Sequence, residues 1–184
     1  MNVQSHLHMN KPTFLNWVQG REGRYELAGS RVVMMTGGSI AHAEIIKNLI
    51  VLLHGRIDRQ KWTVVADFGV DLGPETLRYP DVMLVPKGAA RDSLTVTTPA
   101  LIAEVASPSS ATLDLGDKAT EYLNLSSLVA YLVFDQNESK AWAWLRTSAG
   151  FTPGAEIISG RGETIRVPVL EIELPLSDVY AGLD

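Results

Sequence analysis

The chain has 184 residues, of which 46% are hydrophobic and 20% are charged, and its formal net charge at pH 7 is −5. This composition is that of a globular protein with a substantial core, and the net charge argues against a strongly basic surface for nucleic acid. Because cysteine is absent, disulfides, thiolate zinc sites and cysteine nucleophiles are excluded. No apolar run approaches the roughly 20 residues that span a bilayer, and the first residues lack a signal-peptide pattern. We therefore expect a cytoplasmic protein with no membrane partner.

The N-terminal part of the chain predicts a short helix, a hairpin and a long helix. A helix is predicted over Pro12–Val18, since proline suits the first helical turn. Two short strands follow, Tyr25–Leu27 and Arg31–Met35, and Gly29 between them suits a turn that needs positive φ. Residues Ile40–Gln60 then repeat apolar side chains with a helical period, which predicts a long helix with one buried face.

The middle of the chain predicts three strands. The first is expected over Trp62–Leu72, where apolar residues form a mixed pattern. Two shorter apolar runs follow, Val82–Val85 and Leu101–Val105, each bounded by proline and polar residues. The almost continuous apolar character of the last run is typical of a central strand that is buried on both faces.

A helix that carries Lys118 is expected next, with Thr112 or Asp114 as its N-terminal cap. Further strands are predicted over Val129–Asp135, Lys140–Leu145, Ala155–Ile158, Thr164–Val167 and Leu170–Leu174. Ser177 is expected to cap a last helical turn through Tyr180. This order of strands, hairpins and helices predicts an α/β fold, or more broadly a mixed α+β fold, with a central mixed β-sheet flanked by helices.

No linker, internal repeat or low-complexity tract divides the sequence. Residues 1–10 are polar and are expected to form a flexible N-terminal tail. Residues 11–184 are expected to fold as a single domain.

Two carboxylates stand at the ends of the two central apolar runs. Asp81 precedes Val82–Val85, and Glu104 lies near the end of Leu101–Val105. If the two strands are neighbours in one sheet, these side chains converge at one point. Anionic oxygens on rigid strands are what Mg²⁺ or Mn²⁺ requires. Glu104 in particular needs a partner, since an unpaired buried carboxylate is costly, and a metal or a lysine would serve.

Seven segments of the chain carry a resemblance to a known family. They are Tyr25-Glu26-Leu27, the strand end Met34-Met35, Ser39 to His42, Arg78-Tyr-Pro-Asp81-Val, Glu104-Val-Ala-Ser-Pro, Asp114-Leu-Gly-Asp-Lys118 with Glu121-Tyr122, and Tyr131-Leu-Val-Phe-Asp135. In this order they resemble the PD-(D/E)xK nuclease superfamily and, more closely, the Uma2-like restriction endonuclease family. The resemblance covers nearly the whole chain after about residue 11. It departs from the superfamily at Ala106, where a lysine is expected, and Lys118 matches the lysine that the Uma2-like family carries on the following helix.

The resemblance implies a restriction-endonuclease-like core and an endonuclease that depends on Mg²⁺ or Mn²⁺. It implies a nucleic-acid substrate, with DNA as the first expectation, and a homodimer. Asp81, Glu104 and the carbonyl of Val105 would bind the metal. Lys118 would help to activate water and would stabilise the developing charge on the phosphate. Glu26 matches an upstream acid that would assist from outside the metal's immediate ligands, so the implied catalytic residues are Glu26, Asp81, Glu104 and Lys118.

Two further residues are candidates for contact with the substrate. His42 lies in the first turn of the predicted long helix, where the helix dipole favours an anion such as phosphate. Tyr122 lies four residues after Lys118 and therefore shares its helix face. The alternatives are a structural role at the helix start for His42 and packing in the core for Tyr122.

The other candidates also have plainer interpretations. Lys118 and Asp114 would form an ordinary exposed helix pair, and Glu26 would pair on the surface with Arg24 or Arg31. A second hypothesis is therefore a non-catalytic module of nuclease fold that binds or regulates, and the negative net charge favours it. A third hypothesis is a metal-dependent hydrolase of a phosphodiester that is not a nucleic acid.

Overall fold

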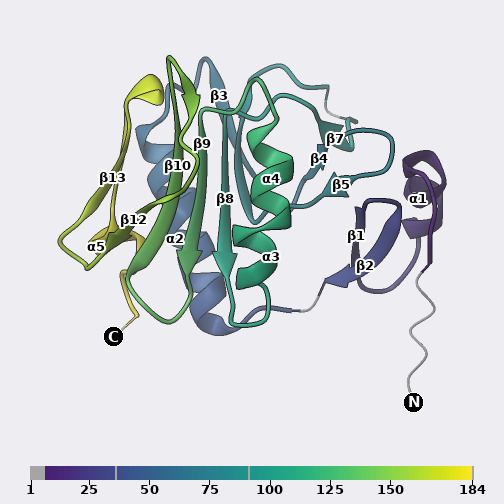
Figure 1. Ribbon diagram of the computed structural model, residues 1–184, viewed down its shortest axis with the longest axis horizontal. Coiled ribbons are helices and arrows are strands. Elements are labelled where there is room, and N and C mark those ends of the chain that lie inside the picture. The colour runs from purple at the N-terminus through teal and green to yellow at the C-terminus, as the bar shows by residue number, and fades with distance from the viewer. Residues whose placement is uncertain (1–6, 36, 91, 184) are drawn as a thin grey trace.

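The computed structural model describes residues 7–35, 37–90 and 92–183. Its main sheet has the strand order β11-β10-β9-β8-β6-β3, and β12 pairs with β10 (Figure 1). The strands are β3 (Trp62–Ala66), β6 (Val82–Pro86), β8 (Leu101–Ala106), β9 (Ala130–Asp135), β10 (Lys140–Thr147), β11 (Gly150–Phe151) and β12 (Glu156–Ser159). β8 and β9 are parallel, whereas the other neighbours are antiparallel, so the predicted mixed sheet is confirmed.

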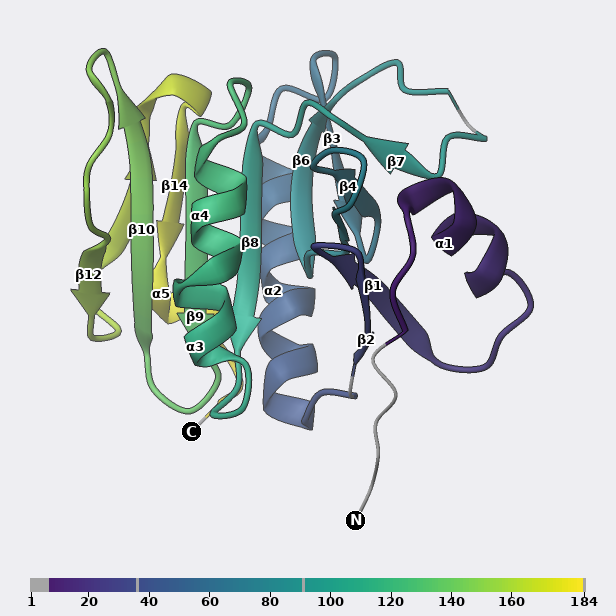
Figure 2. The ribbon, with the colours of Figure 1, turned by 45° about the vertical axis from the view of Figure 1, so that its right-hand side comes forward.

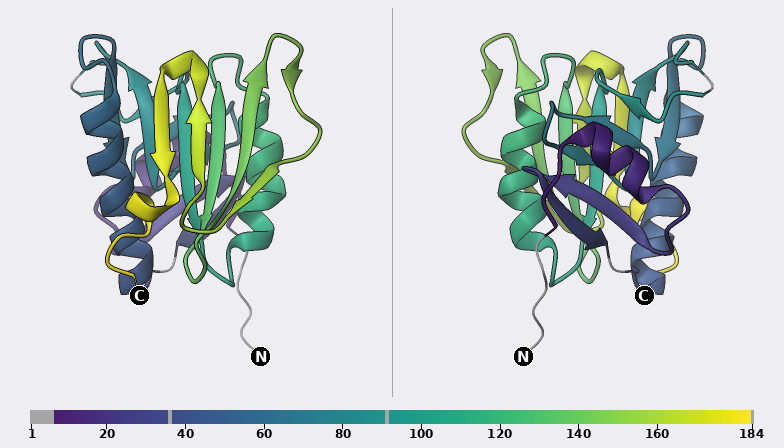
Figure 3. Two further views of the ribbon diagram at one scale, coloured as in Figure 1. Left: turned by 90° about the vertical axis from the view of Figure 1, so that its left-hand side faces the viewer. Right: turned by 90° about the vertical axis from the view of Figure 1, so that its right-hand side faces the viewer.

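Different elements cover the two faces of the main sheet (Figure 3). One face packs against α2 (Ile40–Arg56), the hairpin of β13 (Thr164–Val167) and β14 (Ile172–Pro175), and the short α5 (Leu176–Val179). A 3₁₀ turn, η1 (Pro168–Leu170), connects the two strands of that hairpin. The other face packs against α3 (Ala111–Leu115) and α4 (Asp117–Leu123). All six residues of β8 are buried between these layers, which confirms the prediction of a central strand.

A smaller sheet lies beside the main one, with the order β2-β1-β5-β4-β7 (Figure 2). Its strands are β1 (Arg24–Ala28), β2 (Arg31–Met35), β4 (Gly69–Asp71), β5 (Leu77–Arg78) and β7 (Thr95–Val96). The helix α1 (Lys11–Val18) packs Phe14 against Leu27 and Leu77 of this sheet. Gly29 and Ser30 form the predicted tight turn of the β1–β2 hairpin, and both have positive φ.

Part of the predicted flexible tail is paired with the β1–β2 hairpin. The N–H of Met9 donates to the carbonyl of Ser30 at 2.8 Å, and the N–H of Val32 donates to the carbonyl of Leu7 at 2.9 Å, so residues 7–9 pair with the hairpin. The prediction of a flexible tail for residues 1–6 concerns residues outside the described ranges. The assignment of residues 11–184 to a single domain stays a prediction. In the part of the chain that is described, no helix has both the length and the apolar character that crossing a membrane requires.

Two predicted elements are shorter than expected. The strand predicted over Trp62–Leu72 is divided between the two sheets, because Asp67 takes a positive φ of 50° and turns the chain. The helix predicted over Ile40–Gln60 ends at Arg56. There the Asp58 side chain accepts a hydrogen bond from the N–H of Gln60 at 2.9 Å and so stabilises a turn.

The helix predicted around Lys118 is broken at Gly116 into α3 and α4. A Cβ at Gly116 would lie 2.7 Å from the carbonyl oxygen of Thr112 in α3, so the turn that ends α3 requires glycine. The N-cap of α3 is Ser110, and neither Thr112 nor Asp114 holds that position. Ser177 likewise does not cap the last helix, which begins after Pro175.

Candidate functional site

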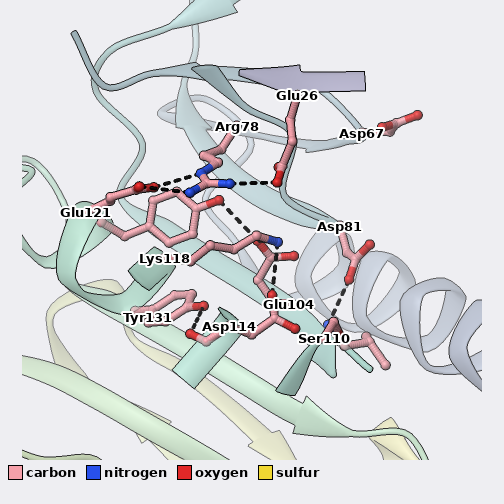
Figure 4. Close-up of polar contacts among 12 residues, drawn as sticks. Glu26, Asp67, Arg78, Asp81, Glu104, Ser110, Asp114, Lys118, Glu121 and Tyr131 are labelled. Carbon is pink, nitrogen blue, oxygen red and sulfur yellow. Dashed lines mark hydrogen bonds and ion pairs between the residues drawn. The ribbon is translucent and has the colours of Figure 1, made fainter. Parts of the chain in front are cut away.

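The antiparallel pairing of β6 and β8 brings the two predicted carboxylates together. Val82 lies opposite Ala103, so Asp81 and Glu104 extend from the same end of this strand pair. Oδ2 of Asp81 accepts a hydrogen bond from the N–H of Val105 at 2.7 Å, which fixes its carboxylate beside β8 (Figure 4). The expected convergence of Asp81 and Glu104 is therefore present in the structure.

Lys118 joins this pair from α4. Its Nζ lies 3.0 Å from Oε1 of Glu104 and 2.9 Å from Oδ1 of Asp114, and the lysine side chain is 8% exposed. The interpretation of Lys118 and Asp114 as an exposed surface pair is therefore wrong. The two helices that carry these residues pack onto the main sheet, and this packing buries both side chains.

Tyr122 of α4 holds the carboxylate of Glu104. Its hydroxyl donates to Oε1 of Glu104 at 3.1 Å, and its ring packs edge-on against Tyr131, 5.2 Å away between ring centroids. The Tyr122 side chain is fully buried and holds the carboxylate of Glu104, as the packing alternative requires. Contact of Tyr122 with the substrate stays a prediction.

The buried charges perturb one another. Burial raises the pKa of Glu104, the nearby carboxylates of Asp81 and Asp114 raise it further, and Lys118 opposes the shift. Burial alone would lower the pKa of Lys118, but the carboxylates of Glu104 and Asp114 outweigh it and raise that pKa above its ordinary value. The ammonium of Lys118 thus stays protonated at neutral pH, with three carboxylates close to it.

Glu26 is held by an arginine that the sequence did not single out. Arg78 Nη1 donates to Oε1 of Glu26 at 2.6 Å, and Arg78 Nε and Nη2 donate to the two carboxylate oxygens of Glu121 at 2.7 and 2.8 Å (Figure 4). The expected surface pairing of Glu26 with Arg24 or Arg31 is therefore wrong. The other oxygen of Glu26, Oε2, is buried and has no hydrogen-bond partner among the residues that the structure describes.

His42 approaches the site from the start of α2. The hydroxyl of Ser39 caps this helix and accepts from the N–H of His42 at 3.1 Å. Nε2 of His42 lies 3.5 Å from Oδ1 of Asp81. A hydrogen bond with the Asp81 side chain raises the pKa of His42, although partial burial opposes the rise. His42 therefore contacts a predicted metal ligand directly.

A pocket of about 600 Å³ joins these groups. The predicted site residues that line it are Glu26, His42, Asp81, Glu104, Val105 and Lys118. Its walls come from the β1–β2 hairpin, from the start of α2, and from the loop between β8 and α3. Residues from distant parts of the sequence thus meet around one hollow that is open to solvent.

Comparison with known proteins assigns this arrangement to a family. A family model described as "Putative restriction endonuclease" matches residues 12–177. The chain belongs to the Uma2 family. One curated relative of the Uma2 chain is an "Uncharacterized protein sll1609" of Synechocystis sp.. The two are 35% identical over 116 residues. This match covers 60% of the Uma2 chain and 66% of the relative, just under two thirds.

Among solved structures, the Uma2 chain is similar to the crystal structure of "a putative nuclease belonging to DUF820" from Anabaena variabilis. The match covers 94% of this chain and 98% of that one, with a TM-score of 0.78 and 12% sequence identity. This likeness shows a shared fold. The family resemblance and the fold class predicted from the sequence are both confirmed.

The oxygen donors of the Uma2 site fit a divalent cation. In residues 7–35, 37–90 and 92–183, no three histidine, aspartate or glutamate side chains stand in a metal-binding cluster. Asp81 and Glu104 instead provide two carboxylates, and Val105, whose carbonyl is the third predicted donor, directly follows Glu104 on β8. Hard oxygen donors of this kind suit Mg²⁺ or Mn²⁺. A cation would also offset the negative charge that raises the pKa of Glu104.

Proposed function

We propose that this chain is a divalent-metal-dependent endonuclease that hydrolyses phosphodiester bonds of nucleic acid. The observation that carries the proposal is the meeting of Asp81, Glu104 and Lys118 in one pocket. The family and the fold support a nuclease. The metal dependence and the residue roles are the proposal's own content, and the expected homodimer stays a prediction.

Asp81, Glu104 and the carbonyl of Val105 would hold the cation. A divalent cation bound there supplies positive charge to the reacting phosphate and lowers the pKa of a bound water. The N–H of Val105 keeps Asp81 in place, and Tyr122 does the same for Glu104. The protein would thus present its ligands in a fixed arrangement before the substrate arrives.

Lys118 acts in this proposal as a fixed positive charge. The neighbouring carboxylates of Glu104 and Asp114 raise its pKa and so favour the charged ammonium. It can donate hydrogen bonds to a phosphate oxygen or to the attacking water, where charge develops. Asp114 and Glu104 hold it at the floor of the pocket.

Glu26 contributes a negative charge near Lys118. Arg78 binds one carboxylate oxygen of Glu26, and the other oxygen, Oε2, is buried with no hydrogen-bond partner among the described residues. The charge of Glu26 favours the protonated form of Lys118 and raises its pKa. Glu26 would therefore act as a positioning residue for Lys118, and Arg78 holds Glu26 in place.

A titration with Mn²⁺ tests the proposed ligands. We expect Glu104→Gln to weaken Mn²⁺ binding at least about tenfold and to abolish metal-dependent cleavage of DNA and RNA oligonucleotides. Glu173→Gln is the matched control, since Glu173 forms an exposed ion pair with Arg166, and it should bind Mn²⁺ as the wild type does. Unchanged Mn²⁺ binding by a folded Glu104→Gln variant would contradict the proposal.

The second candidate function is a non-catalytic binding module. It is favoured by one observation, which is that Lys118 is already paired with Glu104 and Asp114 inside the protein. Such a module would fold equally well but would cut neither nucleic acid nor other phosphodiesters. Cleavage by the wild type that is lost in Glu104→Gln would separate the enzyme from the module.

A further inference from the structure

The pocket has little free positive charge on its described lining. Its cationic side chains are Arg24 and Lys118, together with His42 when it is protonated, against the carboxylates of Glu26, Asp81, Glu104 and Asp114. His42 lies beside Asp81, with 3.5 Å between Nε2 and Oδ1. Lys118 is paired with two of those carboxylates, and Arg24 is paired with Asp67. Proteins that bind duplex DNA gain most of their affinity by neutralising several phosphates with lysine and arginine. This pocket lacks that means of holding a duplex.

Two walls of the pocket carry apolar side chains in place of free positive charge. In the β1–β2 hairpin, Glu26 lies opposite Val33 and Arg24 lies opposite Met35, so these side chains share the face that lines the pocket. Pro108 and Leu113 line it from the loop after β8 and from α3. Unstacked bases expose apolar faces that such walls can contact, and methionine adapts readily to different shapes. In a duplex those faces are stacked and only the edges are accessible.

The proposed reacting groups are recessed between these walls. The side chains of Glu104 and Lys118 are 4% and 8% exposed, and that of Asp81 is 13% exposed. A phosphate must therefore enter the hollow to reach them. The volume of about 600 Å³ is that of a small-molecule site, which accommodates a nucleotide or two of an unpaired strand.

From these features we infer that the pocket takes single-stranded nucleic acid in preference to duplex. An unpaired base would lie between Met35 and Leu113, and its phosphate would lie beside Asp81 and Glu104. This inference rests on the proposed function, because it names the substrate class of the same site.

Binding without metal tests this inference separately from catalysis. A labelled DNA 20-mer, the RNA of the same sequence and the corresponding DNA duplex would be titrated in EDTA by fluorescence anisotropy. We expect at least one single strand to bind about tenfold more tightly than the duplex, with a shallow salt dependence of about 0.7 logarithmic units per phosphate contacted. Whether the DNA or the RNA single strand binds more tightly shows which sugar the pocket prefers. Equal or tighter binding of the duplex, or binding of neither form, would overturn the inference.

Two substitutions at Met35 locate the proposed base-binding wall. Met35→Ala should weaken single-strand binding roughly threefold to tenfold by removing apolar contact area, whereas Met35→Phe should retain or increase it. Ile157→Ala is the control, since Ile157 is a 61% exposed strand residue on β12, and it should bind as the wild type does. Unchanged binding by Met35→Ala would overturn the placement of the base. Single-strand binding without any Mn²⁺-dependent cleavage would refute the proposed enzyme and leave this inference standing.

Discussion

Replacing Arg78 with methionine is expected to destabilise the fold strongly. Arg78 is 2% exposed, and its guanidinium makes hydrogen bonds of 2.6, 2.7 and 2.8 Å to Glu26 and Glu121. Through them it connects the smaller sheet to α4, the helix that carries Lys118. Methionine keeps much of the length and apolar stem of arginine, so the substitution removes mainly the charge and its hydrogen bonds.

The size of the expected loss in free energy of unfolding follows from the burial of Glu26. Removing one partner of a buried ion pair leaves a buried charge without compensation and costs about 3–5 kcal/mol. For a chain of this size, that loss lowers Tm by about 6–20 °C. Arg166→Met is the matched control, since Arg166 pairs with Glu173 over 3.0 Å but both side chains are well exposed. An exposed pair of this kind contributes about 0–1 kcal/mol.

Urea unfolding of both variants at neutral pH would measure the difference. We expect Arg78→Met to lower the free energy of unfolding by several times the loss in Arg166→Met. Adding Glu26→Gln to Arg78→Met should recover about 1 kcal/mol or more, because the double variant no longer buries the unpaired charge of Glu26. If Arg78→Met costs no more than Arg166→Met, the reasoning about this buried network is refuted.

Three further predictions concern the surroundings of the site. Tyr122→Phe should lower the free energy of unfolding by about 0.5–1.5 kcal/mol, because it removes the hydrogen bond to Glu104. His42 has a pKa raised from 6.5, so the stability it contributes is present below that pH and is lost as the pH rises through its folded-state pKa. His42→Gln should therefore cost more stability at about pH 5.5 than at about pH 8.5. Gly116→Ala should cost about 1–3 kcal/mol, because its Cβ would meet the Thr112 carbonyl oxygen at 2.7 Å.

Urea unfolding checks all three, and each has a result that contradicts it. A wild-type stability in Tyr122→Phe would mean that its hydroxyl is not needed to hold Glu104. If His42→Gln lowers the free energy of unfolding equally at both pH values, the charge interaction between His42 and Asp81 does not contribute to stability. For the glycine, Gly162→Ala is the control, since a Cβ there meets no neighbouring atom, and it should stay within about 0.5 kcal/mol of wild type. Equal stability of the two alanine variants would contradict the close approach at Gly116.

The part of the site that rests on local patterns could be predicted from the sequence. The two apolar runs that became β6 and β8 indicated two strands, and the structure pairs them as neighbours. Once they pair, the positions of Asp81 and Glu104 at their ends follow from the register. Ser39 caps α2 through the N–H of His42, only three residues away, and serine at such a position is a local N-cap signal.

The part that depends on distant packing could not be predicted. Helical spacing indicated that Asp114 and Lys118 share a face, but it does not say which surface covers that face. Arg78 stands in a recognisable motif, yet its partners Glu26 and Glu121 are far from it in sequence, and many carboxylates were available. The break of the predicted strand at Asp67 could not be predicted either. Non-glycine residues with positive φ, such as Asp67, carry only a weak sequence signal.

The most direct test of the central claim is a cleavage time course with the wild type and Lys118→Met. Both proteins would be incubated with a labelled single-stranded oligonucleotide in Mn²⁺ and, in parallel, in EDTA, after circular dichroism has shown that both are folded. We predict strand cleavage by the wild type only in Mn²⁺, and a rate at least about 100-fold lower for Lys118→Met. No cleavage by the wild type would contradict the nuclease proposal, and full activity in Lys118→Met would remove Lys118 from the chemistry.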